Sequence, residues 1–594
     1  MSDLDTGDET RPDGRTSSPE TLRLRAATRA LRLHLDELPT VFHFNGPGDQ
    51  FFAELAFPFA RQRYSCAESL IGAGFGGTVI GSLARSLFVD GLRWMWVGAA
   101  PSERLVTLLG SMMEERNRIC MTLENSGASC PILPRWFAPI TEITNMTGAS
   151  TAWLQAPAIP DEQNLLDQFL AKPIATRNVS LCLSNATPKE LLASAEQLLA
   201  IAGLQGAVLV LAHAGHGNLL GLQSSLTKDG VTGHDLRPDH EALFMQVAAV
   251  GVILTLLGVC IAIPESWPEE AQKESSLEEA IRLTRDVVDA ATEIHGLGRI
   301  RHPTNVAKKQ SNSSLKMTSL LHPNVVLDSD SLLSDVNTAE HVIATAEEYD
   351  SFATSWTLNP WKQSSNNLGA ILVYSGSHSL LETVMATYDR TGSEVIAVFA
   401  ARMLLEEAAR FHWMTFDPSE QVVVERSKIY FDEYRYRRQK AIKAFAGNGV
   451  TQRNAEKLLS LPDNIVVPAS QHVVPSGRKP LPSITEMLRN LSKDYPEIGW
   501  MEVAYSLLSQ ATHSTPIGHL HMIRVRSGEF QSGVISPELL GLTLDAACLG
   551  SAHLLGSSSV LLTHGSQEAK KYALELLKCA YKVHDTARFT HGLD

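Results

Sequence analysis

Apolar side chains recur every three or four positions along most of this chain, the spacing of amphipathic helices. The first such segment covers 18–37, and the most regular one covers 393–447, where two helical stretches meet at Asp417 and Pro418. Proline suits the first turn of a helix, because its missing N–H would have no partner there. The pattern predicts a hairpin of two antiparallel helices over 393–447.

This hairpin has a counterpart nearer the N-terminus. Residues 82–118 align with 399–435 without a gap, at a constant shift of 317 positions. Weaker pairs follow in the same order: 186–203 with 482–493, 209–213 with 508–513, 242–264 with 539–565, and 276–294 with 567–584. The sequence therefore predicts an all-α protein of two tandem, duplicated helical bundles that form a pseudo-twofold pair.

The composition along the chain sets the expected boundaries. We expect a disordered tail over 1–20, a first helical repeat over 21–295, a linker over 296–345 rich in Ser, Asn and Pro, and a second repeat over 346–594. Runs of β-type residues are few and short, at 208–212, 422–424 and 464–468.

One stretch has the length of a membrane span. Residues 242–264 carry no charge, and an apolar run of this length can cross a bilayer. Its counterpart at 539–565 contains Asp545 and His553 and is rich in Gly and Ser. A helix that is hydrophobic all round can also be a central helix buried on every side. We therefore predict a buried core helix in each bundle and no membrane association.

Charge and cysteine content narrow the class of protein. The formal net charge of −14 over 594 residues disfavours RNA or DNA as a partner, because such surfaces neutralise phosphates with Lys and Arg. The seven cysteines are scattered, which is typical of free thiols in a reducing compartment. We expect a cytoplasmic protein, and the sequence does not indicate an oligomeric state.

Charged residues on the second hairpin are the main candidates for chemistry. Arg402, Glu406 and Arg410 are four residues apart and share one helix face, and Asp432 and Arg435 share a face of the next helix. Paired guanidinium groups bind phosphate or carboxylate, so one interpretation is an anion pocket. The other interpretation is a buried ion-pair network that fixes the register of two helices. Both stay open at this point.

The first hairpin has a partial version of this set. Arg85, Arg93, Glu115 and Arg118 stand at the matching positions, but Val89 replaces Glu406 and Asp90 matches Glu407. We interpret the first copy as degenerate and expect any chemistry in the C-terminal half.

Two histidines extend the candidate site. His213 and His513 each follow a mostly apolar segment and precede a turn that contains Gly or Pro. A histidine there can act as a general acid or base, or can hydrogen-bond the backbone at a helix end. Glu406 and His513 are the catalytic candidates. The histidine spacings lack the third ligand of a metal site, and we expect no metal and no cofactor.

Short motifs in the second half resemble a known group of proteins. They are RxxLE within 401–408, DxxR at 432–435 and LSxxxHS at 508–514. With them, residues 390–520 resemble an uncharacterised bacterial helical family, a domain of unknown function distantly similar to the HEPN nucleotide-binding bundles. The resemblance implies a bacterial protein, with a role in stress or phage defence and with nuclease or nucleotide-directed hydrolase activity.

Three functions remain as hypotheses. The first is a helical protein whose Arg/Glu/His pocket binds a phosphate or carboxylate group of a small anion, or a protein partner. The second is the hydrolase that the resemblance implies. The third is a non-catalytic interaction scaffold.

Overall fold

The structure is a computed structural model of the chain. It describes residues 18–38, 48–71, 73, 76–126, 159–166, 198, 203–214, 226–227, 230–231, 236–263, 270–297, 339–356, 358, 368–417, 419–447, 449–461, 481–494, 501–513, 515, 518–519, 521–526, 529–532 and 535–591.

The N-terminal half has eight described helices and one short hairpin of strands. In chain order they are α1 (Pro19–Glu37), α2 (Gly48–Leu70), α3 (Gly77–Gly98), α4 (Pro101–Ser126), α6 (Glu162–Leu166), α8 (Leu204–Ala214), β1 (Leu226–Thr227), β2 (Gly230–Val231), α10 (Pro238–Ala262) and α11 (Glu270–His295).

The C-terminal half follows with a similar series. It consists of α12 (Glu340–Ser355), α14 (Leu368–Thr387), α15 (Glu394–Thr415), α16 (Glu420–Gly447), α17 (Gln452–Leu458), α18 (Ile484–Asp494), α19 (Met501–Thr512), β3 (Ile523–Arg526), β4 (Glu529–Ser532), α21 (Pro537–Leu562) and α22 (Gln567–His591). Both strand pairs are antiparallel. The predicted all-α fold is confirmed, with two short strand hairpins beside it.

A buried central helix organises each half. In the N-terminal half α10 packs against α2, α3 and α11, and in the C-terminal half α21 packs against α14, α15 and α22. Both central helices begin with a proline, Pro238 and Pro537, and the Ser536 hydroxyl accepts a hydrogen bond from the Leu539 N–H at 3.1 Å. This capping satisfies an N–H that has no partner within the helix. The predicted buried helices at 242–264 and 539–565 are therefore present.

Glycines allow α3 and α10 to approach closely. A Cβ atom on Gly251 would lie 2.5 Å from the Leu87 carbonyl carbon, and one on Gly258 would lie 2.4 Å from that of Trp94. The matching contact in the second half is looser, since a Cβ on Gly550 would lie 3.1 Å from the Leu404 carbonyl carbon. The first pair of helices is thus packed backbone against backbone, which leaves no room for a side chain.

The partners of each helix recur between the halves. The contact of α1 with α11 corresponds to that of α12 with α22, and the contact of α2 with α10 corresponds to that of α14 with α21. The order of the described elements is similar, although two helices (α6 and α8) precede the first strand hairpin where three (α17, α18 and α19) precede the second. This is the arrangement that a duplication would produce, and the duplication itself stays a prediction.

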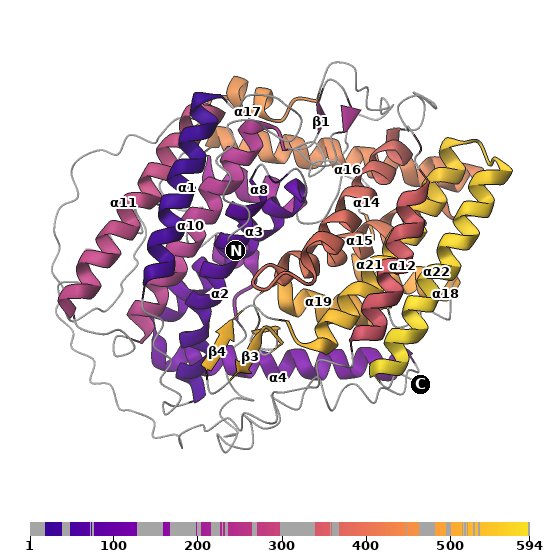
Figure 1. Ribbon diagram of the computed structural model, residues 1–594. Helices are drawn as coiled ribbons and strands as arrows, with labels where there is room; N and C mark the ends of the chain where they lie inside the picture. Colours follow the sequence, from indigo (N-terminus) through magenta and orange to yellow (C-terminus); the bar gives the residue numbers. More distant parts are fainter. Residues whose placement is uncertain are drawn as a thin grey trace.

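Each half extends one helix onto the other half. Helix α4 packs on α19 as well as on α2 and α3, and α16 packs on α8 as well as on α15 and α17. Figure 1 shows α4 running beneath the C-terminal half and α16 running above towards α8. Helices α3 and α15 also touch each other. The two halves are therefore interlocked, with a seam along α3, α15, α19 and α8.

Several predicted boundaries need correction. Helix α1 begins at Pro19, inside the predicted tail, because Ser18 caps its first turn. Helix α12 begins at Glu340, inside the predicted linker, so the second half starts earlier than residue 346. The β-type runs at 208–212 and 422–424 lie within α8 and α16, since burial against other helices overrides a short β-branched run. Residues 1–17, 298–338 and 464–468 lie outside the described residues.

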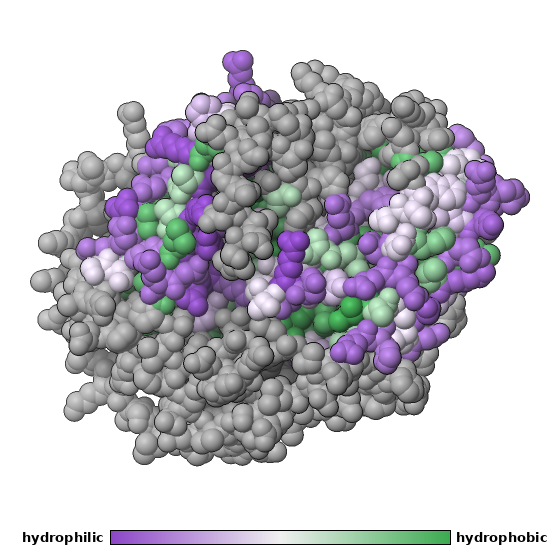
Figure 2. Space-filling view, viewed as in Figure 1, coloured by the Kyte–Doolittle hydropathy of each residue, from purple (hydrophilic) through white to green (hydrophobic). Residues whose placement is uncertain are grey.

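Among the described helices, two are long and apolar enough to cross a membrane, and both are buried in the molecule. They are α10, whose most apolar window is wholly buried, and α21, whose window is 89% buried. From the sequence, only α10 and not α21 was expected to have the length and apolar character of a membrane span. On the face shown in Figure 2, hydrophobic residues form small patches between hydrophilic ones. The absence of membrane association stays a prediction.

Candidate functional site

A small pocket lies on the seam between the two halves. Its cavity volume of about 10 Å³ is enough for about one water molecule. Helix α3 supplies one wall, and α15 and the end of α19 supply the other. The lining residues are Ser82, Arg85, Ser86, Val89, Asp90, Phe399, Arg402, Thr512 and His513. Arg85 and Arg402, which align in the two hairpins, thus face the same pocket together with His513.

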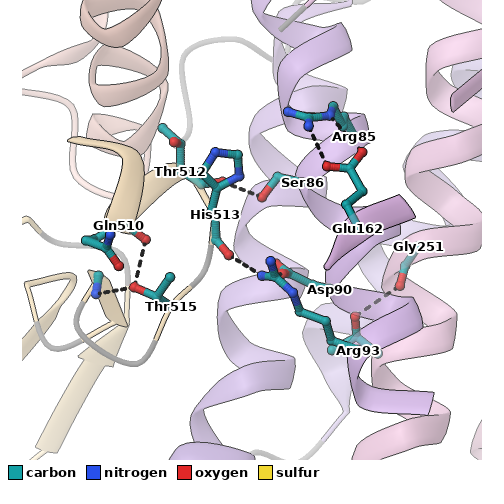
Figure 3. A network of polar contacts seen from close by, with 12 residues as sticks. Arg85, Ser86, Asp90, Arg93, Glu162, Gly251, Gln510, Thr512, His513 and Thr515 are labelled. Carbon is teal, nitrogen blue, oxygen red and sulfur yellow. Dashed lines mark hydrogen bonds and ion pairs between the residues drawn. The ribbon is translucent and has the colours of Figure 1, made fainter. Parts of the chain in front are cut away.

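Arg85 holds the carboxylate of Glu162 with two hydrogen bonds. Its Nε lies 3.2 Å from Oε1 and its Nη2 lies 2.5 Å from Oε2, and Figure 3 shows the pair beside α3. Both side chains are partly exposed. This is the two-point geometry with which a guanidinium group binds a carboxylate or phosphate. Glu162 comes from the five-residue helix α6.

The end of α19 is fastened to α3 through its backbone. The Ser86 hydroxyl donates to the Thr512 carbonyl oxygen at 2.7 Å, and Arg93 Nη1 donates to the His513 carbonyl oxygen at 2.6 Å. Figure 3 shows both contacts. The last carbonyl groups of a helix lack partners within it, so these bonds satisfy them. His513 is therefore placed by residues of the other half.

The predicted face of α15 forms a buried charge network. Glu406 accepts from Arg402 at 2.8 Å through Oε1 and from Arg410 at 3.1 Å through Oε2, and Arg410 also binds Glu407 at 2.5 Å. Arg402 and Glu406 are 2% and 0% exposed. Tyr505 donates to Glu406 Oε1 at 3.1 Å, and Arg402 Nε donates to Ser509 at 3.1 Å. The network thus joins two arginines and two carboxyl groups along one face of α15.

Burial and neighbouring charges shift the pKa values of these groups in opposite directions. Burial alone lowers the pKa of Arg402, but the neighbouring Glu406 and Tyr505 outweigh it and raise that pKa. Burial raises the pKa of Glu407 to about 7, although Arg410 opposes this. Ionisation of Glu407 is therefore costly even beside its partner, as expected for a carboxylate removed from water.

The first hairpin holds a related network. Asp90 binds Arg63 of α2 at 2.6 Å and Arg93 at 3.3 Å. The pair of Asp90 and Arg93 repeats the spacing of Glu407 and Arg410, three residues apart on the aligned helix. The first copy is thus no separate, degenerate site. Its residues Arg85 and Asp90 line the same pocket as Arg402 and His513. The expectation that chemistry belongs to the C-terminal half alone does not fit this arrangement.

Other predicted site residues lie outside the pocket lining. Asp432 and Arg435 pair with each other at 2.7 Å on α16 and are 27% and 28% exposed. Glu115 and Arg118 pair on α4, with Arg118 Nε 2.9 Å from Oε2, and Gln510 of α19 also donates to Glu115. His213 belongs to α8, but its side chain lies outside the described part of the chain.

Several residues of the site were not predicted from the sequence, among them four that hold its charged groups: Tyr505, Ser509, Arg63 and Glu162. Tyr505 and Ser509 precede His513 by eight and four residues, so the same helical face could have indicated them. Arg63 and Glu162 belong to segments distant in sequence from their partners, and no local spacing reveals such pairs. Among the described residues, no group of three or more His, Cys, Asp or Glu side chains could hold a metal ion.

Comparison with known proteins adds no relative. No family model matches the sequence. The curated proteins and the solved structures likewise contain no match to it. The HEPN-like resemblance therefore stays a prediction, and any function has to be argued from the geometry of this site.

Proposed function

We propose that this protein binds a small molecule through a carboxylate or phosphate group, at the pocket between α3, α15 and α19. The observation that carries this proposal is the two-point contact of Arg85 with the Glu162 carboxylate. A carboxylate of the chain itself stands where the ligand's anionic group would bind. Arg402, which is paired with Glu406, and His513 line the same pocket, and the His513 imidazole can hydrogen-bond a ligand.

The size of the pocket determines how such a ligand would enter. A cavity of about 10 Å³ accepts about one water molecule, which is much smaller than a phosphate group. The ligand's anionic group would therefore take the place of the Glu162 carboxylate on Arg85. The Arg85 and Glu162 side chains are 13% and 26% exposed, so the ligand's anionic group has to replace the carboxylate in the same two-point geometry.

The buried network on α15 would act as support rather than as chemistry. Both Glu406 oxygens already accept hydrogen bonds from arginines, and Tyr505 binds one of them as well. Glu406 also lies outside the pocket lining, so it is not placed to take a proton from a ligand there. Glu406 would instead hold Arg402 in place at the pocket wall. His513 remains the candidate for proton transfer if the bound ligand also reacts.

Phosphate binding to the full chain tests this proposal. Isothermal titration with sodium phosphate would compare the natural chain with Arg85→Met and Glu162→Gln. Removing the competing carboxylate is expected to tighten phosphate binding about fivefold, which corresponds to about 1 kcal/mol. Removing the guanidinium is expected to abolish binding.

The control is Arg282→Gln, which removes an exposed arginine paired with Glu279 and Asp286 on α11. It should bind phosphate as the natural chain does. Binding that survives Arg85→Met, or that is no tighter in Glu162→Gln, would overturn the proposal. Loss of phosphodiester cleavage in His513→Ala, if the natural chain cleaves such bonds, would extend binding to hydrolysis.

A further inference from the structure

Behind the pocket, buried nitrogen atoms gather around Asp90 without hydrogen-bond partners. Within the part of the chain that the structure describes, Arg63 Nε and Nη2, Arg93 Nε and both ring nitrogens of His519 have none. Arg63 is 1% exposed and His519 is 4% exposed. A buried polar atom without a partner carries a cost of about 1–3 kcal/mol, so five such atoms in one place require an explanation.

These side chains belong to one cluster. Arg63 and Arg93 both bind Asp90, at 2.6 and 3.3 Å. The His519 ring stacks on Phe59, with ring centroids 4.4 Å apart, and Phe59 lies one helical turn before Arg63 on α2. Burial, together with the charges of Arg63 and Arg93, lowers the pKa of His519 well below its usual value. The imidazole is therefore neutral and offers one N–H donor.

The hydrogen-bonding balance of the cluster favours an anion over water. Four arginine hydrogens on three nitrogen atoms and one imidazole N–H need acceptors, and the only unpartnered acceptor among these atoms is the other ring nitrogen of His519. Asp90 already accepts from both arginines. A water molecule offers two lone pairs and brings two hydrogens that need acceptors of their own. An anion accepts from several donors and donates none.

The charge balance indicates which kind of anion fits. Arg63 and Arg93 contribute two positive charges, Asp90 one negative charge, and the neutral His519 none, so one positive charge remains. Arg63 is out of water, whereas the Arg93 side chain is 25% exposed, and a positive charge beside buried groups is stabilised by a counter-ion. We infer that Arg63, Arg93 and His519 enclose a binding site for one small monovalent anion, such as a halide ion. None of the three lines the pocket of Arg85 and Arg402, although their partner Asp90 does, so variants of Arg85 and of His519 are needed to distinguish this site from the proposed function.

Bromide is the probe for this site, because it replaces chloride and can be located by its anomalous scattering. The full chain would be purified and crystallised in sodium bromide without chloride. The expected result is an anomalous peak in contact with Arg63, Arg93 and His519. A fully occupied water molecule at that place, with no anomalous peak, would overturn the inference.

A solution measurement accompanies the crystal. The melting temperature of the natural chain should rise saturably with sodium bromide, compared with sodium fluoride at equal ionic strength. His519→Phe keeps the stacking on Phe59 but removes both ring nitrogens, and it should lose this bromide-specific rise. Arg63→Met leaves Asp90 with one arginine fewer, so it serves as a second variant only if it folds.

Two further variants separate this site from others. Arg237→Gln removes an arginine that also pairs with an aspartate, Asp239 at 2.6 Å, and it should keep the bromide effect. Arg85→Met, which should abolish phosphate binding, should keep it too. A bromide effect that persists in His519→Phe would contradict the inference and leave the proposed function untouched.

Discussion

At the scale of single residues, the charged side chains buried in this protein are held in place by hydrogen bonds and ion pairs with neighbouring side chains. Glu406 is fully enclosed and accepts hydrogen bonds from Arg402, Arg410 and Tyr505. Such a network contributes little net stability, because its attraction offsets the cost of removing charges from water. Breaking it is different, since one change leaves two arginines partly uncompensated in the core.

Replacement of Glu406 tests this reasoning. Glu406→Ala should reduce the free energy of unfolding by about 3–5 kcal/mol, the usual cost of an uncompensated buried charge. Asp432→Ala serves as the matched control, because its pair with Arg435 is also within one helix but is partly exposed. It should cost no more than about 1 kcal/mol. Urea unfolding measures both, and similar losses would show that burial does not set the cost.

The sequence predicted which residues of α15 form this network, but not which residues of other helices contact them. Spacing along one helix placed Arg402, Glu406 and Arg410 on one face, and the apolar residues around them indicated that they must pair. Spacing could not bring Arg85 of one half to the pocket of His513 in the other. That contact depends on how α3, α15 and α19 meet, which no local pattern encodes.

At the scale of elements, the central helices decide how tightly each half packs. Helices α3 and α10 meet through Gly251 and Gly258, which leave backbone atoms in contact across the interface. Hydrophobic pattern alone predicted both α10 and α21 as buried helices. It did not distinguish the close packing of α10 from the looser packing of α21, because that difference depends on which residue faces each glycine.

Replacing a glycine of each central helix by alanine tests the difference between the close packing of α10 and the looser packing of α21. A Cβ at Gly251 would meet the Leu87 carbonyl carbon at 2.5 Å, so Gly251→Ala should destabilise by about 3 kcal/mol. A Cβ at Gly556 of α21 would meet the Ala573 methyl group at 3.1 Å, a milder contact. There the gain in helix propensity, about 0.5–1 kcal/mol, should offset much of the strain. Melting temperatures of the two variants provide the measurement, and equal losses would contradict this account.

At the scale of the whole molecule, each half has a helix that is covered by a helix of the other half. The Phe445 ring of α16 covers Gly206 of α8 so closely that a Cβ there would lie 2.4 Å from it. Helix α4 covers α19 in return. The predicted domain division could not indicate these contacts between the two halves, because a contact between helices distant in sequence produces no periodic pattern along the chain.

Cutting the chain between the halves tests the interlocking. A protease-cleavable sequence in place of 298–338 would allow cleavage in the folded protein. The fragments ending at Leu297 and beginning at Ala339 should then elute together in gel filtration, because α4 and α16 still join them. Gly206→Leu, which places a side chain against Phe445, should promote their separation. Fragments of the natural sequence that separate while staying helical would refute the interlocking.

The covering of α8 by Phe445 also bears on how the protein is made. Gly206 and Phe445 are 239 positions apart, and a ribosome adds about 5–20 residues per second. The apolar face of α8 therefore emerges roughly 12–50 seconds before the helix that covers it. During that interval the nascent N-terminal half exposes a surface suited to unwanted association. Its folding in the cell would depend on protection by chaperones until α16 has been synthesised.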